Sequence, residues 1–181
     1  KGRDSLALLR YMMELSRTHT VYPICGNCDG LVFRFFETDE LDGRFYASYL
    51  PQHPESTIRQ LADEMGFEDW MDFPALSAAM RERYPEIHAW LAGLPTILET
   101  EHLVFVHGGV PSLEHMETLD RWKCMKNDDF RGQGHSFSKY VIVGHWPVTL
   151  YKPKGPSAAP LFDYDRKIIS IDGGCVLKED G

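Results

Sequence analysis

The order of apolar and polar positions first predicts a helix and then a short strand. Leu6, Leu9 and Met13 are among apolar residues that recur at helical spacing, which predicts a helix over 5–18. The apolar run at 21–25 that follows is short and predicts a buried strand. A helix followed directly by a strand favours parallel pairing in an α/β sheet.

From residue 33 to about 95 the pattern becomes mainly helical. The runs 56–65, 75–84 and 87–91 have helical spacing, and a proline precedes each of the first two, as is common near helix starts. We therefore expect a helical insertion at about 33–95. Its aromatic residues favour packing in a core over binding a ligand: Phe33, Phe35, Phe36, Phe45, Tyr46 and Tyr49.

The second half of the chain predicts strands joined by loops. The apolar runs lie at 96–99, 103–106, 140–143, 161–164 and 168–171. Because these runs are not separated by long helices, they indicate antiparallel or mixed pairing. A chain of 181 residues is long enough for one sizeable core, so we expect a single domain over 1–181.

Composition and charge exclude several classes of protein. The net charge of −8 leaves no basic surplus, which argues against nucleic acid or an anionic membrane as a main partner. The apolar runs fall far short of the ~20 residues that cross a membrane. Four cysteines are too few for a disulfide scaffold, and no signal peptide is visible, so we expect a reducing cytoplasm. The oligomeric state is not indicated.

Three of the predicted strands end at a side chain that can bind a metal. Asn27 follows the run 21–25, His107 follows 103–106, and His145 follows 140–143. Taken alone, Asn27 is equally a turn residue. If the ends of these strands converge on one edge of a sheet, an amide oxygen and two imidazoles share one ion. That donor set suits manganese, iron or zinc better than calcium.

A C-x-x-C pair, Cys25 and Cys28, overlaps the first of these positions. It can be interpreted as a redox pair or as half of a zinc site. A thioredoxin-like redox pair should lie at the start of a helix, whereas residues 30–33 do not indicate a helix. A zinc site would need a second C-x-x-C, and the sequence has none. We therefore favour the metal site at the strand ends.

Three short motifs resemble those of the calcineurin-like metallophosphoesterases, in particular the protein serine/threonine phosphatases and their bacterial relatives. The family has Gly-Asn-His-Asp/Glu, then a His in a Val-His-Gly/Ala-Gly turn, then Gly-His-Thr-Pro, matched here at 26–29, 106–109 and 144–147. Residues 171–175 look like the family's closing strand and turn. The resemblance covers essentially the whole chain. It implies an α/β fold with a mixed two-sheet β-sandwich flanked by helices in four layers.

The resemblance also implies a two-metal centre, with manganese as the first expectation and iron or zinc as alternatives. Asn27, His107 and His145 would bind the second ion, and Asp29 would orient the residue at position 28. Residues 1–5 look like the end of the family's second motif. By that alignment the Asp-x-His motif, the bridging Asp and the N-terminal strands lie upstream, and this chain should bind metal weakly, if at all.

Two residues depart from the family pattern. The family's phosphate-binding Arg corresponds to Lys1. The ammonium group of a lysine is a compact charge and cannot make the two parallel hydrogen bonds that a guanidinium makes with a phosphate. The catalytic His corresponds to Cys28, although some phosphodiesterases in the wider superfamily carry the same Gly-Asn-Cys-Asp. General acid catalysis contributes a factor of about 10²–10⁴ to the rate. Without the histidine, the hydrolysis of esters with poor leaving groups should be slowed most. A further Arg of the family is not evident, but Lys126 or Asn127 lies near its place.

The function that these observations predict is metal-dependent hydrolysis of a phosphoester by water activated between two metals. A phosphomonoesterase of the serine/threonine-phosphatase type is expected first, acting on a phosphorylated protein or a small phosphoester. A phosphodiesterase or dinucleoside polyphosphate hydrolase of the same superfamily is the alternative within enzymes. The alternative from another class is a degenerate member that keeps the fold as a binding or regulatory module, which the departures at Cys28 and Lys1 favour.

Overall fold

The computed structural model describes residues 2–37, 43–151 and 158–175. In these residues it contains seven α-helices and one five-stranded mixed sheet, so the predicted α/β class is confirmed. The chain forms two compact units. A helical unit comprises Lys1–Tyr22 and Cys28–Gly93, and a sheet unit comprises Pro23–Asn27 and Leu94–Gly181. The single domain that we expected stays a prediction.

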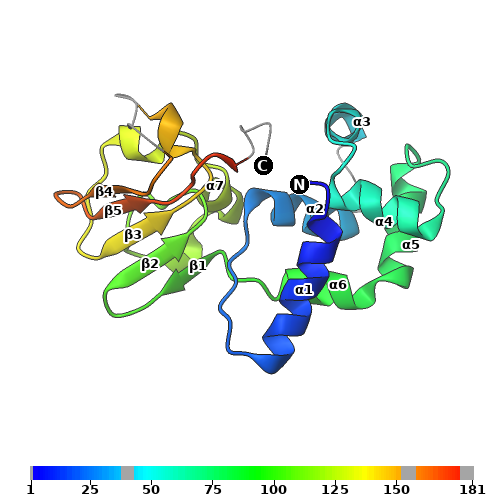
Figure 1. Ribbon diagram of the computed structural model, residues 1–181, viewed down its shortest axis with the longest axis horizontal. Coiled ribbons are helices and arrows are strands. Elements are labelled where there is room, and N and C mark those ends of the chain that lie inside the picture. The colour runs from blue at the N-terminus through cyan, green and yellow to red at the C-terminus, as the bar shows by residue number, and fades with distance from the viewer. Residues whose placement is uncertain (1, 38–42, 152–157, 176–181) are drawn as a thin grey trace. The chain divides into compact units, whose positions relative to one another are not determined.

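The helical unit contains the first six helices (Figure 1). They are α1 (Ser5–Thr18), α2 (Asn27–Glu37), α3 (Gly43–Gln52), α4 (Thr57–Met65), α5 (Phe73–Arg83) and α6 (Pro85–Ala92). The predicted helix over 5–18 is confirmed. Helix α2 begins at Asn27, six residues before the start expected for the helical region, so it takes in positions that we had assigned to a turn. In the described part of the chain, no helix combines the length and apolarity needed to cross a membrane.

Local caps explain where two of these helices start. The Ser56 hydroxyl accepts from the Arg59 amide at the start of α4, and the Asp72 carboxylate accepts from the Ala75 amide at the start of α5. Each cap satisfies one of the amides that a first helical turn leaves without a partner. Helix α4 ends at Met65 and is capped by Gly66, whose φ of 66° is left-handed and favours glycine.

The aromatic residues of the helical unit largely fill its core. Phe35 and Phe36 are fully buried, and the hydroxyl of buried Tyr46 donates to the Leu31 carbonyl at 3.0 Å. The expected packing role is therefore confirmed for these three residues. Phe45 differs, because its ring is exposed at the surface of α3.

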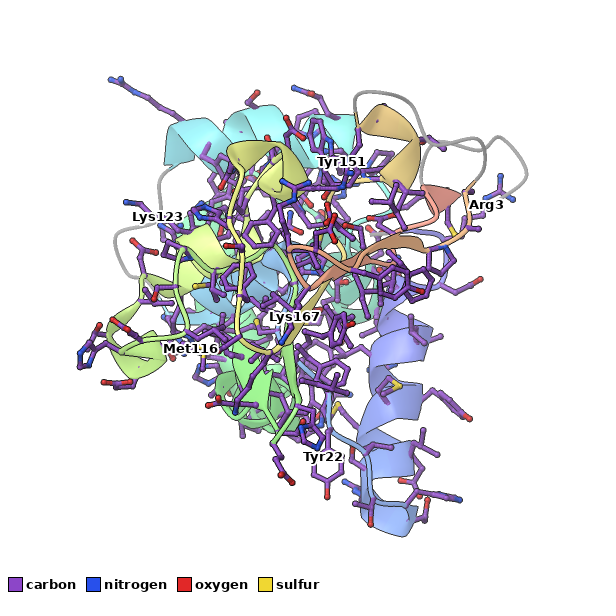
Figure 2. The ribbon with its side chains drawn as sticks, turned by 90° about the vertical axis from the view of Figure 1, so that its left-hand side faces the viewer. Arg3, Tyr22, Met116, Lys123, Tyr151 and Lys167 are labelled. Carbon is purple, nitrogen blue, oxygen red and sulfur yellow. The ribbon has the colours of Figure 1, made fainter. Side chains whose placement is uncertain are left out.

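Residues 21–25 do not form the predicted strand. Proline has no amide hydrogen, so Pro23 interrupts any hydrogen-bonded ladder through this segment. The Cys25 amide donates to the Pro95 carbonyl at 2.7 Å, which ties the end of the segment to the sheet unit. Tyr22 is 71% exposed and points outward (Figure 2), so the apolar run there is not a buried strand.

The five strands lie in the order β1-β2-β3-β5-β4 (Figure 1). They are β1 (Ile97–Glu99), β2 (Leu103–Val106), β3 (Tyr140–Val143), β4 (Leu161–Asp163) and β5 (Ile168–Ser170). The central strands β2, β3 and β5 are parallel, and the edge strands β1 and β4 pair antiparallel with their neighbours. Mixed pairing is therefore confirmed, and each predicted strand is present to within one residue at either end.

Alternation along the strands gives the sheet two different faces. On one face lie buried side chains such as Val104, Val141 and Ile168, which belong to a core with Phe130 and with Cys124 of α7 (Arg121–Met125). On the other face one apolar residue from every strand forms a continuous row in register: Leu98, Phe105, Ile142, Ile169 and Phe162. This apolar row is partly exposed, and Phe162 is 52% exposed.

Candidate functional site

Two of the predicted ligands follow neighbouring parallel strands. His107 comes directly after β2, and His145 comes after β3 with Gly144 between them. Because β2 and β3 run parallel, their carboxyl ends meet at the same edge of the sheet. The Gly144 amide donates to the His107 carbonyl at 3.0 Å, and the two imidazole rings lie 5.2 Å apart between centroids. The predicted convergence of these histidines is confirmed.

Asn27 reaches the same edge by a different route from the one predicted. The segment before it is not a strand, but the hydrogen bond from Cys25 to Pro95 fixes it against the sheet unit. The Asn27 Oδ1 atom lies 2.9 Å from Nε2 of His107. An amide oxygen and an imidazole nitrogen that are distant in sequence are thus brought together in the sheet unit.

The spacing and charge state of these groups fit a divalent ion. Asn27 Oδ1 accepts a hydrogen bond from His107 Nε2 at 2.9 Å, and two ligands bound about 2.1 Å from one ion at a right angle would have a similar separation of about 3 Å. An imidazole binds metal in its neutral form. Burial, helped by the nearby His145, lowers the pKa of His107 to about 4, while Asp172 opposes this shift. His107 is therefore neutral at pH 7.

The site depends on the amide as well as on the imidazoles. Among the described residues, no group of three or more His, Cys, Asp or Glu side chains is arranged to hold a metal ion. The candidate donor set remains the one that the sequence predicted, Asn27 with His107 and His145. The arrangement of these three residues is the feature that agrees with the sequence prediction.

A lysine and an aspartate lie beside His145. The Asp128 Oδ1 atom is 2.9 Å from Nε2 of His145, and Lys126 contacts the same carboxylate oxygen. The Lys126 Nζ atom is also 3.3 Å from Nε2 of His145. The hydrogen bond from Lys126 is the main cause that lowers the pKa of Asp128, so this carboxylate is ionised at neutral pH.

Of the two residues that we placed near the family's further Arg, the structure brings Lys126 to the cluster. The Asn127 Oδ1 atom instead accepts a hydrogen bond from Gln133 at 2.6 Å. Asp128 was missed by the sequence analysis. The position of Asp128 in the sequence does not indicate its contact with His145, because that contact depends on how the loop after α7 packs.

Gly108 explains how that loop reaches the site. Its amide donates to the Cys124 carbonyl at 2.7 Å, which places the turn after β2 directly against the end of α7. A Cβ atom at Gly108 would lie 2.7 Å from the same carbonyl oxygen and 2.9 Å from the Asn127 amide nitrogen, both backbone atoms. Only glycine permits this close approach, which holds residues 126–128 next to the strand ends.

The backbone at His145 adopts an uncommon conformation. Its φ is 60°, in the left-handed region that non-glycine residues rarely occupy. Such conformations cost free energy and are concentrated at functional sites. The turn Gly144–Pro147 that the sequence predicted is therefore present, with His145 at its strained position.

Cys28 and Asp29 lie outside the sheet unit. They follow Asn27 in the first turn of α2 and belong to the helical unit, while Lys1 lies outside the described residues. Because α2 begins at Asn27, the C-x-x-C does run into a helix, and our argument that no helix follows it is wrong. The burial of Cys25 still disfavours a redox pair, since reactive thiols are accessible.

Comparisons with known proteins give no independent support for a family. No protein-family model matches the chain, and neither the curated proteins nor the solved structures contain a match. The resemblance to metallophosphoesterases therefore rests on the three sequence motifs alone.

Proposed function

We propose that this protein hydrolyses phosphoesters with the help of divalent metal ions, as a phosphomonoesterase of the serine/threonine-phosphatase type. The observation that carries the proposal is the 2.9 Å approach of Asn27 Oδ1 to His107 Nε2 beside the ring of His145. A divalent ion at these ligands would supply charge to stabilise the phosphoryl oxygens and would lower the pKa of the attacking water. Manganese suits the donor set, with iron or zinc as alternatives.

The other residues of the proposal have roles that rest on the motif correspondence. Cys28 stands in the place of the proton donor, Asp29 would orient it, and Lys1 would contact the phosphate. The proposed substrate is a phosphorylated protein or a small phosphoester. This choice also rests on the motif correspondence, because the positive charge of Lys126 beside His145 is paired with Asp128. We propose the cytoplasm as the site of action.

The fold proposed with this function is a two-sheet sandwich flanked by helices. The apolar row from Leu98 to Phe162 supports it, because a row that crosses all five strands suits burial under a second sheet. Sheets in a sandwich pack about 10 Å apart with such side chains between them. The described residues contain one five-stranded sheet, and the second sheet is part of the proposal.

The test is an assay of the full-length protein, with added manganese, on a chromogenic phosphate monoester and on a diester. His107→Ala and His145→Ala should each lower turnover at least about 100-fold, since even the loss of a group that only supports a metal ligand costs up to that much. His102→Ala is the matched control, because the His102 side chain is 79% exposed. Its turnover should equal that of the unmodified protein.

The pattern of activity also separates the alternatives. A preference for the diester would favour the phosphodiesterase alternative and would agree with a thiol at position 28, which assists a poor leaving group less than an imidazole does. Manganese binding without turnover of either ester would favour a binding or regulatory module. Neither binding nor turnover would mean that the proposal is wrong.

A further inference from the structure

We propose that Asp128 is a positioning residue, which fixes the nitrogen of His145 that is available to a metal ion. This inference rests on the proposed function and concerns the same site. The Asp128 Oδ1 atom lies 2.9 Å from Nε2 of His145. The carboxylate oxygen accepts in this contact, so Nε2 carries a proton and Nδ1 is the nitrogen left for a metal ion.

Lys126 does not compete with this assignment. Its ammonium group is 3.3 Å from Nε2 of His145, but a nitrogen that donates to Asp128 cannot also accept from Lys126. The contact with the carboxylate is the shorter of the two, and it is strengthened by charge. Lys126 donates to the same oxygen of Asp128 instead. It therefore holds the carboxylate in place and balances its charge.

The arrangement is the one that metal-binding histidines commonly have. A ligating imidazole usually donates its other ring N–H to a carboxylate or a carbonyl, which fixes both the tautomer and the ring orientation. The His145 side chain is only 10% exposed, whereas that of Asp128 is 51% exposed. Replacing the carboxylate therefore removes the hydrogen bond without opening a cavity in the core.

The first measurement reports the tautomer without any metal. Nitrogen NMR of the metal-free protein at about pH 8 should show His145 protonated at Nε2. Asp128→Asn keeps an acceptor oxygen and should preserve this tautomer. Asp128→Ala has none and should shift the ring toward protonation at Nδ1. Asp165→Asn, at an exposed aspartate in the turn after β4, is the matched control and should change nothing.

The second measurement is manganese affinity by calorimetry on the same proteins, with folding checked by circular dichroism. Asp128→Ala should weaken binding about 10- to 100-fold and Asp128→Asn by less, while the control keeps full affinity. Protonation of His145 at Nδ1 in the unmodified protein, or an Asp128→Ala variant with unchanged tautomer and affinity, would overturn the inference. If the full-length protein binds no manganese, the proposed function fails, and the tautomer alone decides the role of Asp128.

Discussion

His145 combines a candidate ligand with an unfavourable backbone conformation. Its φ of 60° places a residue with a Cβ atom in the left-handed region, where the side chain crowds the following carbonyl. The Gly144–Pro147 turn nevertheless keeps an imidazole at this position. The cost to stability is understandable if the imidazole is needed there for function.

Two substitutions at His145 separate the backbone cost from the loss of the ring. Both His145→Ala and His145→Gly remove the imidazole, but only glycine relieves the left-handed strain. We expect the Gly variant to be more stable than the Ala variant by about 1 kcal/mol, measured from urea unfolding.

The same pair of substitutions at His102 provides the control, because His102 does not have a positive φ. There the order should reverse, since glycine adds freedom to the unfolded chain. If His145→Ala and His145→Gly have the same free energy of unfolding, the backbone at position 145 is not strained.

At the scale of single residues, the sequence predicted that His107 and His145 lie close together, but it did not predict which residues contact them. His107 and His145 were found because each follows an apolar run whose strand formed as expected. Asp128 could not be found, since its contact with His145 depends on the close approach of Gly108 to Cys124. That approach involves residues far apart in sequence, and no local pattern indicates it.

Among the elements of the helical unit, α1 and α4 are joined by a paired ion contact. The two guanidinium nitrogens of Arg10 lie 2.6 and 2.7 Å from the two carboxylate oxygens of Glu64. The hydroxyl of Tyr84, the residue that follows α5, donates to Glu64 at 3.0 Å. These contacts, with Arg10 as the main cause, lower the pKa of Glu64 to about 2.

This shift predicts how stability depends on pH. In the unfolded chain Glu64 titrates near 4.5, and in the folded protein near 2, so its contribution is present above pH 4.5 and is lost as the pH falls toward 2. Glu64→Gln should lower stability at pH 7 by about 1 kcal/mol or less, because the pair is partly exposed and screened by solvent.

The Glu64→Gln variant should also lose part of the fall in stability between pH 4.5 and 2, as measured by urea midpoints across that range. Glu68→Gln, at an exposed glutamate after α4, serves as the control. Identical pH profiles for the Glu64→Gln variant and the unmodified protein would show that the ion pair contributes nothing.

The elements themselves were largely predictable because their apolar runs have clear limits. Helix α1 and the five strands lie where periodicity placed them, while the run at 21–25 failed because Pro23 interrupts it. The start of α2 was missed because Gly26 and Asn27 are typical turn residues, and Asn is also common at the start of a helix. Local pattern cannot decide between those outcomes without the contacts of Cys25 with the sheet unit.

On the scale of the whole molecule, the three candidate ligands all belong to the sheet unit. A ligand that binds only the folded state stabilises it, by about 2.7 kcal/mol at a hundred times its dissociation constant. Manganese should therefore slow hydrogen exchange at the strand ends, around residues 105–108 and 142–146, and near Asn27. Mass spectrometry of exchanged peptides with and without the metal measures this.

His107→Ala should abolish the manganese effect on exchange. Slowed exchange confined to α3–α6, with the strand ends unchanged, would contradict a site at this edge of the sheet. The two-sheet sandwich remains a proposal, and periodicity alone does not support it. The apolar row that supports it becomes visible only when strand register is known.

Residues 23–27 pack with the sheet unit although the chain on both sides of them belongs to the helical unit. The side chains that would hold an ion therefore stay together if residues 28–93 are exchanged for another helical segment. Positions 28 and 29 would travel with the exchanged segment. Recombination with junctions at these two places is thus a route by which the proposed proton donor could change while the candidate metal ligands are inherited unchanged.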